Sequence, residues 1–113
     1  MRYILRKFAE RDSFKFTVDW DELSIEHVAP QASIGTGDWT ELSVGQLGNL
    51  FLLDPKKNGE LADKPFAKKK QILVDGNYSV PKAILDADKW TPGAVRKHTD
   101  EMAVVAQEEI WKI

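Results

Sequence analysis

The stretch around residues 25–58 places the strongest constraint on the fold of this chain. It holds two short strand-like runs, 23–28 and 50–53, and each is soon followed by a proline, Pro30 or Pro55. Proline has no N–H to donate to a strand ladder, so neither run continues far. The spacer between the runs is rich in glycine and polar residues. The pattern therefore predicts two short strands joined by a long loop.

Helical patterns surround this two-stranded element. Capping residues followed by proline, as in Asp54-Pro55 and Thr91-Pro92, are typical of helix starts. Helices are expected at 2–9, from 55 through Asn58 and Leu61, at 65–74, from about 81 through 85, and from 91 to about 111. The sequence therefore predicts an α+β fold, with a small two-stranded element surrounded by helices.

Two segments between these elements carry other patterns. Residues 14–20 alternate apolar and polar side chains, which predicts either a strand or an extended lead-in to the first strand. Residues 31–45 contain three glycines and scattered polar residues, so a loop is expected there. Trp39 and Leu42 are the side chains expected to hold that loop against the core.

Composition limits the class of protein. A chain of 113 residues with 42% hydrophobic residues fits one domain, 1–113, with a real core. It has no apolar run of about 18 residues that would predict a membrane span, and its N-terminal apolar segment is too short for a signal peptide. The sequence has no cysteine, which excludes a zinc-cysteine site and is compatible with the cytoplasmic location that we expect. Any metal must rest on oxygen and nitrogen ligands.

Charge is distributed unevenly along the chain. The net charge is −2, yet residues 54–70 hold six lysines against three acidic residues. A lysine cluster is usually just a solvated face, and that alternative stays open. Because the cluster directly follows the segment 25–58, it also favours contact with phosphate groups.

His27 is the first residue in this segment that suggests chemistry. A lone histidine is more often structural than catalytic, but this one lies at the end of a predicted strand, before Pro30. Imidazole is the natural base for activating water, and phosphodiester hydrolysis needs such a base together with a cation. The adjacent Glu26 points to the opposite face of a regular strand, so it cannot orient His27 from the same side. A bend there would let its carboxylate reach a metal.

Two asparagines, nine residues apart, complete the set. Mg²⁺ prefers oxygen ligands and keeps several waters, so one carboxylate and one amide oxygen are sufficient protein support. Asn58, on the helix after the second strand, supplies that amide oxygen. Asn49, before the second strand, either donates to the imidazole or holds the loop between the strands. Taken alone, each asparagine also fits a cap or a turn.

These residues together resemble a known nuclease motif. Glu-His-Val-Ala-Pro-Gln at 26–31, followed by Asn49 and Asn58, is similar to the HNH, or ββα-metal (His-Me finger), nuclease superfamily. There an acid-His-x-x-Pro pattern lies on the first strand, an asparagine precedes the second, and a histidine or asparagine lies on the helix. The HNH domains of RNA-guided CRISPR nucleases show a similar His-x-x-Pro-Gln and the same step between asparagines.

A closer resemblance covers nearly the whole chain. It is carried by residues 24–31, 47–53, 58–66, Lys69-Lys70, Trp90-Thr91 and a closing helix that ends in Ile110-Trp111. These segments resemble the C-terminal nuclease domain of GmrSD-type modification-dependent restriction enzymes. In that family the domain commonly follows an N-terminal nucleotide-hydrolysing domain. The resemblance therefore implies DNA as substrate and such a domain or subunit as a partner, with this chain an excised domain or a stand-alone relative.

The resemblance also implies a role for each site residue. His27 is the general base, Asn49 orients it or the loop, and Glu26 and Asn58 are ligands of one divalent metal, Mg²⁺ or Mn²⁺. Contacts with DNA phosphate are expected from Lys57, Lys69 and Lys70.

Two positions depart from the family pattern. The usual acid of the superfamily is Asp, and Glu26 is one methylene longer, which leaves direct ligation open. On the last helix His98 stands where the family usually has Arg, and we expect a structural or surface role for it.

The sequence allows three functions. The first is a divalent-metal-dependent DNA endonuclease domain that acts in restriction or anti-phage defence and takes its specificity from another domain or subunit. The second is a non-catalytic nucleic-acid-binding or interaction module on the same fold, against which the intact Glu26, His27, Asn49 and Asn58 argue. The third is a purely structural helical domain, which leaves the motif unexplained. The sequence favours the first.

Overall fold

The computed structural model describes residues 2–61 and 64–110, with the backbone alone described at residues 58, 109 and 110. Its helices are α1 (Arg2–Arg11), α2 (Glu41–Gly45), α3 (Asn58–Leu61), α4 (Phe66–Asp75), α5 (Lys82–Asp86) and α6 (Pro92–Val105). Its strands are β1 (Ser24–His27) and β2 (Leu50–Leu53). Short 3₁₀ turns lie at Trp20–Glu22, Gln31–Ser33, Leu47–Asn49 and Pro55–Lys57, and a π-helical turn, Ala106–Ile110, continues α6. The α+β class expected from the sequence is confirmed.

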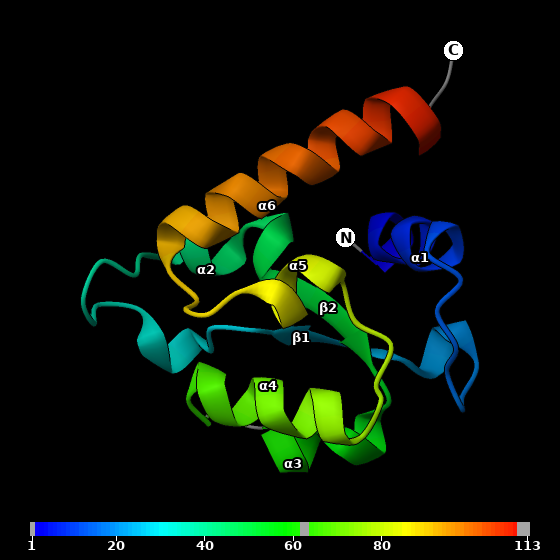
Figure 1. Ribbon diagram of the computed structural model, residues 1–113, viewed down its shortest axis with the longest axis horizontal. Coiled ribbons are helices and arrows are strands. Elements are labelled where there is room, and N and C mark those ends of the chain that lie inside the picture. The colour runs from blue at the N-terminus through cyan, green and yellow to red at the C-terminus, as the bar shows by residue number, and fades with distance from the viewer. Residues whose placement is uncertain (1, 62–63, 111–113) are drawn as a thin grey trace.

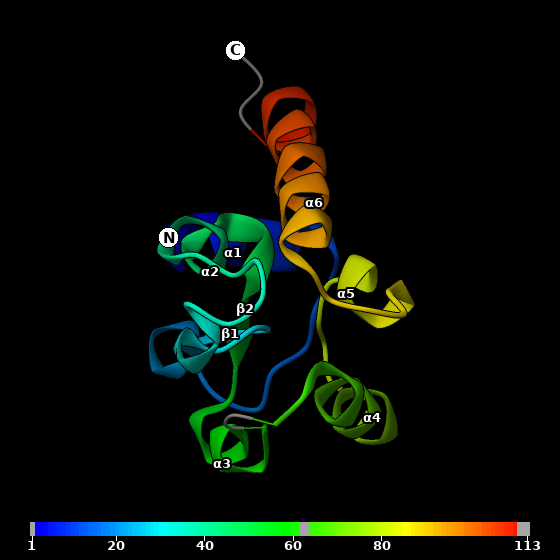
Figure 2. The ribbon, with the colours of Figure 1, turned by 90° about the vertical axis from the view of Figure 1, so that its left-hand side faces the viewer.

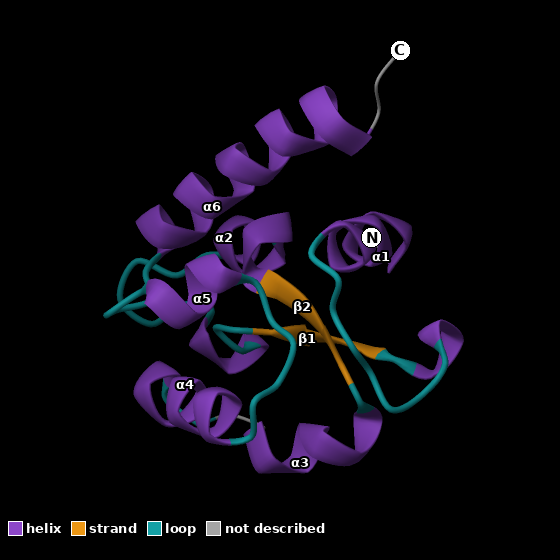
Figure 3. Ribbon diagram, turned by 45° about the vertical axis from the view of Figure 1, so that its right-hand side comes forward, coloured by secondary structure: helices purple, strands orange, loops and turns teal. Residues whose placement is uncertain are grey.

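The two strands form an antiparallel pair at the centre of the molecule. Ser24 lies opposite Leu53, and His27 lies opposite Leu50. Figures 1 and 3 show α1, α2 and α6 on one side of the pair and α3 and α4 on the other. Figure 2 shows the same layers from the side, with α6 and α4 at opposite ends of the view. All four residues of β2 are buried, which explains why its sequence is continuously apolar.

Side chains alternate across the strand pair and fill two cores. The α1 core consists of Leu5, Phe8, Ala9, Leu23, Leu50, Leu52, Met102 and Ala106. The α4 core consists of Val28, Ala29, Phe51, Leu53, Leu61, Leu73, Val80, Ile84, Trp90 and Val95. The sheet is therefore covered on both faces, and its short strands are stabilised by packing on both sides rather than by the length of their ladder.

Helix α6 begins as its sequence predicts. Thr91 Oγ1 accepts a hydrogen bond of 3.1 Å from the backbone N–H of Ala94, and Pro92 occupies the first turn. The expected helix is confirmed through residue 110, and Trp111 lies outside the described residues. No helix in the described ranges 2–61 and 64–110 is long and apolar enough to cross a membrane.

Gly48 allows α6 to approach the turn before β2. Its N–H donates a hydrogen bond of 2.8 Å to Thr99 Oγ1. A Cβ atom added at Gly48 would lie 2.5 Å from Thr99 Oγ1 and 2.6 Å from the Val95 carbonyl oxygen. A larger residue therefore does not fit there. This close contact fixes the turn Leu47–Asn49, and with it the position of Asn49, against α6.

Part of the loop expected at 31–45 is helical. Residues Glu41–Gly45 form α2, because Thr40 and Ser43 make a capping box in which each side chain bonds the other residue's backbone N–H. Trp39 packs against the α4 core as expected. Leu42 is 75% exposed, so the expectation that it holds the loop was wrong. It lies on the outer face of a helix whose inner face is formed by Ser43 and Val44.

Residues 14–20 form the extended lead-in and not a strand. Their alternating apolar side chains, Phe14, Phe16, Val18 and Trp20, are half-buried and pack against the α1 core. The rings of Phe16 and Trp20 meet edge to face, 5.5 Å apart. The alternating apolar side chains of this segment therefore pack against the α1 core, and the expectation of a strand was wrong.

Candidate active site

The chain bends directly after β1, and two residues from other elements bind the peptide groups of that bend. The N–H groups of Val28 and Ala29 donate to the carbonyl oxygen of Asn49 at 2.8 Å and to Asn49 Oδ1 at 2.9 Å. On the opposite edge Lys69 Nζ donates to the carbonyl oxygens of His27 at 3.1 Å and of Val28 at 2.9 Å. The two peptide units that follow His27 are therefore bonded on both edges.

Asn49 is the most constrained polar residue of this region. Its side chain is 0% exposed. The amide nitrogen donates to the carbonyl oxygens of Ala29 at 3.0 Å and Val44 at 2.8 Å. The amide oxygen accepts from the Ala29 N–H and, at 2.9 Å, from Trp90 Nε1. A primary amide makes about four hydrogen bonds, and all four are used here. Of the two roles expected for Asn49, the structure favours holding the loop over bonding the imidazole.

Trp90 contributes to this site, although its sequence context predicts no site role for it. Its indole N–H donates to Asn49 Oδ1, and its ring stacks on Phe66 with centroids 5.6 Å apart. A buried indole N–H needs an acceptor, which is the one signal that the sequence offered. The acceptor is 41 residues away in the chain, so no local pattern identifies it.

His27 is half-buried at the end of β1. Directly paired residues share a face of the sheet, so His27 lies on the face of Leu50, toward the α1 core. Burial lowers the pKa of His27 below its ordinary value; the negative Glu26 opposes this shift, and the positive Lys69 adds to it. A lowered pKa keeps the imidazole neutral at neutral pH, and that is the form that accepts a proton.

Glu26 lies on the other face of β1, opposite Phe51, toward the α4 core. The Ser24 hydroxyl donates to Glu26 Oε1 at 2.7 Å, as neighbours two apart on one face can do. The bend suggested at the end of the strand comes only at residues 28–29, after His27. Glu26 and His27 therefore keep the opposite directions expected of strand neighbours.

Asn58 is the first residue of α3. Its side chain lies outside the described part of the structure. Helix α3 follows β2 through the turn Pro55–Lys57, and Asp54 caps that turn by accepting a hydrogen bond of 3.0 Å from the Lys56 N–H. Leu61 packs in the same core as Phe51, so α3 lies on the face of the sheet to which Glu26 belongs.

The chemistry of these groups suits a hard divalent cation. Within residues 2–61 and 64–110, no three His, Cys, Asp or Glu side chains gather as a metal site. A site built on one carboxylate and one amide oxygen needs no such group, because Mg²⁺ and Mn²⁺ bind carboxylate, amide and water oxygens. Glu26 Oε1 already accepts the Ser24 hydroxyl, which fixes the carboxylate on the face covered by α3. These oxygen donors are of the kind that Mg²⁺ and Mn²⁺ accept, and the binding of a metal by Glu26 and Asn58 stays a prediction.

The three lysines expected to contact DNA lie in different environments. Lys69 is only 3% exposed, and its ammonium group bonds to backbone carbonyls. Lys70 is half-buried and donates to the carbonyl oxygen of Ala87 at 2.8 Å. Lys57 is half-buried beside α3 and lines a cleft of about 290 Å³. Burial argues against a direct phosphate contact by Lys69, whereas contacts by Lys57 and Lys70 stay predictions.

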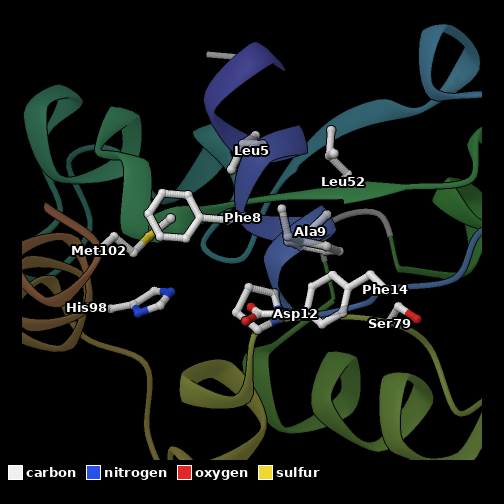
Figure 4. Close-up of a pocket in the computed structure, with 11 residues that line it drawn as sticks. Leu5, Phe8, Ala9, Asp12, Phe14, Leu52, Ser79, His98 and Met102 are labelled. Carbon is white, nitrogen blue, oxygen red and sulfur yellow. The ribbon is translucent and has the colours of Figure 1, made fainter. Parts of the chain in front are cut away.

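His98, on α6, lines an apolar cavity of about 50 Å³. Figure 4 shows its ring beside Phe8 and Met102, with Asp12 across the cavity. Both ring nitrogens are buried, and neither has a hydrogen-bond partner within the described part of the chain. Burial lowers the pKa of His98, opposed by Glu101 and Asp12. This environment agrees with the structural role expected for His98.

Comparison with known proteins identifies the family. The chain matches the family model for the C-terminal domain of GmrSD restriction endonucleases over residues 1–105. No curated protein and no solved structure matches the chain. The match covers both strands, the loop between them, α3, α4 and the whole of α6, and it confirms the resemblance noted in the sequence. The family acts as nucleases in restriction, and this chain belongs to it as a GmrSD-type C-terminal domain.

Proposed function

We propose that this domain is a divalent-metal-dependent DNA endonuclease of the HNH type, with His27 as the general base. The observation that carries the proposal is the order of elements around β1. A strand bearing Glu26 and His27 is followed by a loop, an antiparallel partner strand and a helix that begins at Asn58 on the face of Glu26. This order of elements puts Glu26 and the start of α3 on one face of the small sheet, with His27 next to Glu26 in the chain.

The reaction is hydrolysis of a phosphodiester bond. A neutral His27 accepts a proton from a water molecule as the water oxygen attacks phosphorus, and the bond from phosphorus to the leaving oxygen breaks. A bound Mg²⁺ or Mn²⁺ would stabilise the negative charge that develops on the phosphate and on the leaving oxygen. Glu26 and Asn58 are the residues proposed to hold it. The lowered pKa of His27 supports its part, because an imidazolium ion cannot accept the proton.

The domain is proposed to supply cleavage rather than recognition. It has one candidate site per chain, which favours nicking unless two copies act together. An N-terminal nucleotide-hydrolysing domain or subunit would supply specificity and control. We place the activity in the cytoplasm, in restriction or anti-phage defence. Lys57 beside α3 and Lys70 on α4 are the proposed contacts with DNA phosphate.

Cleavage of supercoiled plasmid tests the proposal. The protein is incubated with plasmid and Mg²⁺ or Mn²⁺, with and without EDTA, beside His27→Ala and His98→Gln. These are the only two histidines of the chain, so the second variant is a matched control outside the site. We expect nicked plasmid from wild type and His98→Gln, and none from His27→Ala or with EDTA.

Two results would contradict the proposal. Equal conversion by wild type and His27→Ala would remove the imidazole from the chemistry. A gel shift with wild type and His27→Ala but no cleavage by either would instead identify a non-catalytic DNA-binding module. Circular dichroism of His27→Ala should match wild type, because a half-exposed side chain at a strand end contributes little packing.

A further inference from the structure

Among the described residues, strand β1 has no neighbouring strand on one of its edges. The sheet formed by residues 2–61 and 64–110 has two strands, so within it β1 pairs with β2 alone. Buried backbone carbonyls on such an edge need donors from elsewhere, because an unbonded buried carbonyl is costly. At the end of β1 the donor is Lys69 of α4, which reaches the carbonyl oxygens of His27 and Val28.

The burial of Lys69 is unusual for its residue type. Lysine is usually exposed to solvent, whereas Lys69 is only 3% exposed. Its neighbours Lys68 and Gln71 on α4 are exposed to solvent. Lys69 therefore points from α4 into the molecule, and its ammonium group is used to bind the chain that follows the candidate base.

The consequence for His27 comes from peptide geometry. A trans peptide unit is planar, with its C=O and N–H on opposite edges. The unit between His27 and Val28 is bonded to Lys69 through its carbonyl and to Asn49 through its N–H, and the unit between Val28 and Ala29 is bonded in the same way. Two successive planes fixed on both edges leave little freedom to the backbone that carries the imidazole.

We propose that Lys69 is a positioning residue for His27: its ammonium group, acting opposite Asn49, holds the end of β1 so that the imidazole keeps the orientation needed for catalysis. The inference rests on the proposed role of His27 as general base. It gives Lys69 a function inside the fold in place of the phosphate contact expected from the sequence. Lys69 itself touches neither water nor phosphate in this role.

The absence of cysteine from the sequence allows a close chemical test. Lys69→Cys removes the ammonium group, and alkylation of the unfolded variant with 2-bromoethylamine followed by refolding restores a lysine-like side chain. Lys69→Met is a second variant without the ammonium group. Lys68→Met is the matched control, because it removes one exposed positive charge from the same helix. Each protein is assayed for plasmid nicking over a range of DNA concentrations.

Loss of a positioning residue should appear in kcat. For Lys69→Met and Lys69→Cys we expect kcat to fall by about 10- to 100-fold, with KM within about twofold, since small misplacements of a catalytic group have effects of this size. Aminoethylation of Lys69→Cys should recover most of kcat, and Lys68→Met should keep it. A wild-type kcat in Lys69→Met, a loss carried by KM alone, or no recovery on aminoethylation would overturn the inference.

NMR separates this inference from the proposed function. The ring signals of His27 should shift in Lys69→Cys and return on aminoethylation, while those of His98 stay in place, whether or not the protein cleaves DNA. In wild type the Lys69 ammonium protons should exchange slowly and show couplings to the carbonyl carbons of His27 and Val28. Fast exchange without such couplings would overturn the inference even where the variants do not fold. An inactive wild type with these NMR results would instead refute only the proposed function.

Discussion

Replacement of Asn49 by alanine is the perturbation whose cost follows most directly from the structure. The amide makes four hydrogen bonds at a site that is 0% exposed. Alanine leaves four buried groups without these partners: the Trp90 indole N–H, the Ala29 N–H, and the carbonyl oxygens of Ala29 and Val44.

The expected loss of stability is large. A buried polar group left unbonded costs about 1–3 kcal/mol. The low end of this range is appropriate here, because the small space left by the amide admits some relaxation, and four such groups then give about 4 kcal/mol. Typical domains are stable by only about 5–15 kcal/mol, so Asn49→Ala should lose a large share of the stability of the fold.

Urea unfolding followed by circular dichroism measures this loss. With a typical dependence of about 1–3 kcal/mol per molar urea, the midpoint of Asn49→Ala should fall by about 1–4 M. The control is Asn77→Gly, at an exposed turn whose φ of 54° suits glycine. That variant should stay within about 0.5 kcal/mol of wild type.

Asn49→Asp separates the donors of the amide from its acceptor. An aspartate keeps an acceptor for Ala29 and Trp90 but turns a carboxylate oxygen toward the carbonyl oxygens of Ala29 and Val44. Burial and these carbonyls should raise the pKa of the new carboxyl in the folded state above its unfolded value of about 3.9. The folded variant then binds a proton more tightly than the unfolded chain, so its destabilisation should be smaller at pH 4 than at pH 7. A loss below about 1.5 kcal/mol for Asn49→Ala, or no pH dependence of the Asn49→Asp loss, would refute this account.

Three further predictions concern stability and metal binding. Gly48→Ala should destabilise the fold by about 1–3 kcal/mol in urea unfolding, because its Cβ would lie 2.5 Å from Thr99 Oγ1. The control Gly59→Ala, whose Cβ would meet no described atom within 4 Å, should not destabilise the fold. Equal effects of the two substitutions would contradict the close contact at Gly48. The pKa of His98 is lowered below 6.5 by burial, so the unfolded chain binds this proton more readily and stability is lost as pH falls through about 6.5. His98→Phe should flatten that part of the pH profile without removing it, and an unchanged slope would speak against the burial of a neutral ring. Asn58→Ala should raise the Mn²⁺ concentration needed for cleavage, and an unaltered metal dependence would exclude it as a ligand.

Much of the central element could be predicted from the sequence. Prolines and a continuous apolar run identify β1 and β2, because proline ends strand pairing and a strand that is buried on both faces consists of apolar residues. The expectation that Glu26 and His27 face opposite sides follows from strand geometry alone, and the structure shows it. Helix α2 was missed because five residues with one capping box give too short a pattern.

The burial of Lys69 and its bonds to backbone carbonyls could not be predicted from the sequence. Because lysine is usually solvated, its place in a run of lysines predicts that Lys69 is exposed to solvent. Its partners are backbone carbonyls 41 and 42 residues earlier, and carbonyls are the same in every residue type. From the sequence, Asn49 could bond either the imidazole of His27 or the loop between the strands. The choice depends on Trp90 and Val44, which are distant in the chain or in its local pattern and come close to Asn49 only in the fold.

We propose that Glu26 and Asn58 hold one divalent metal. Anomalous diffraction from crystals of the His27→Ala protein grown with Mn²⁺ and a short DNA duplex tests it most directly. We expect one anomalous peak within about 2.2 Å of an oxygen of Glu26 and of Asn58, with a DNA phosphate as a further ligand. A peak elsewhere on the protein, or bound DNA with no metal at this position, would contradict it.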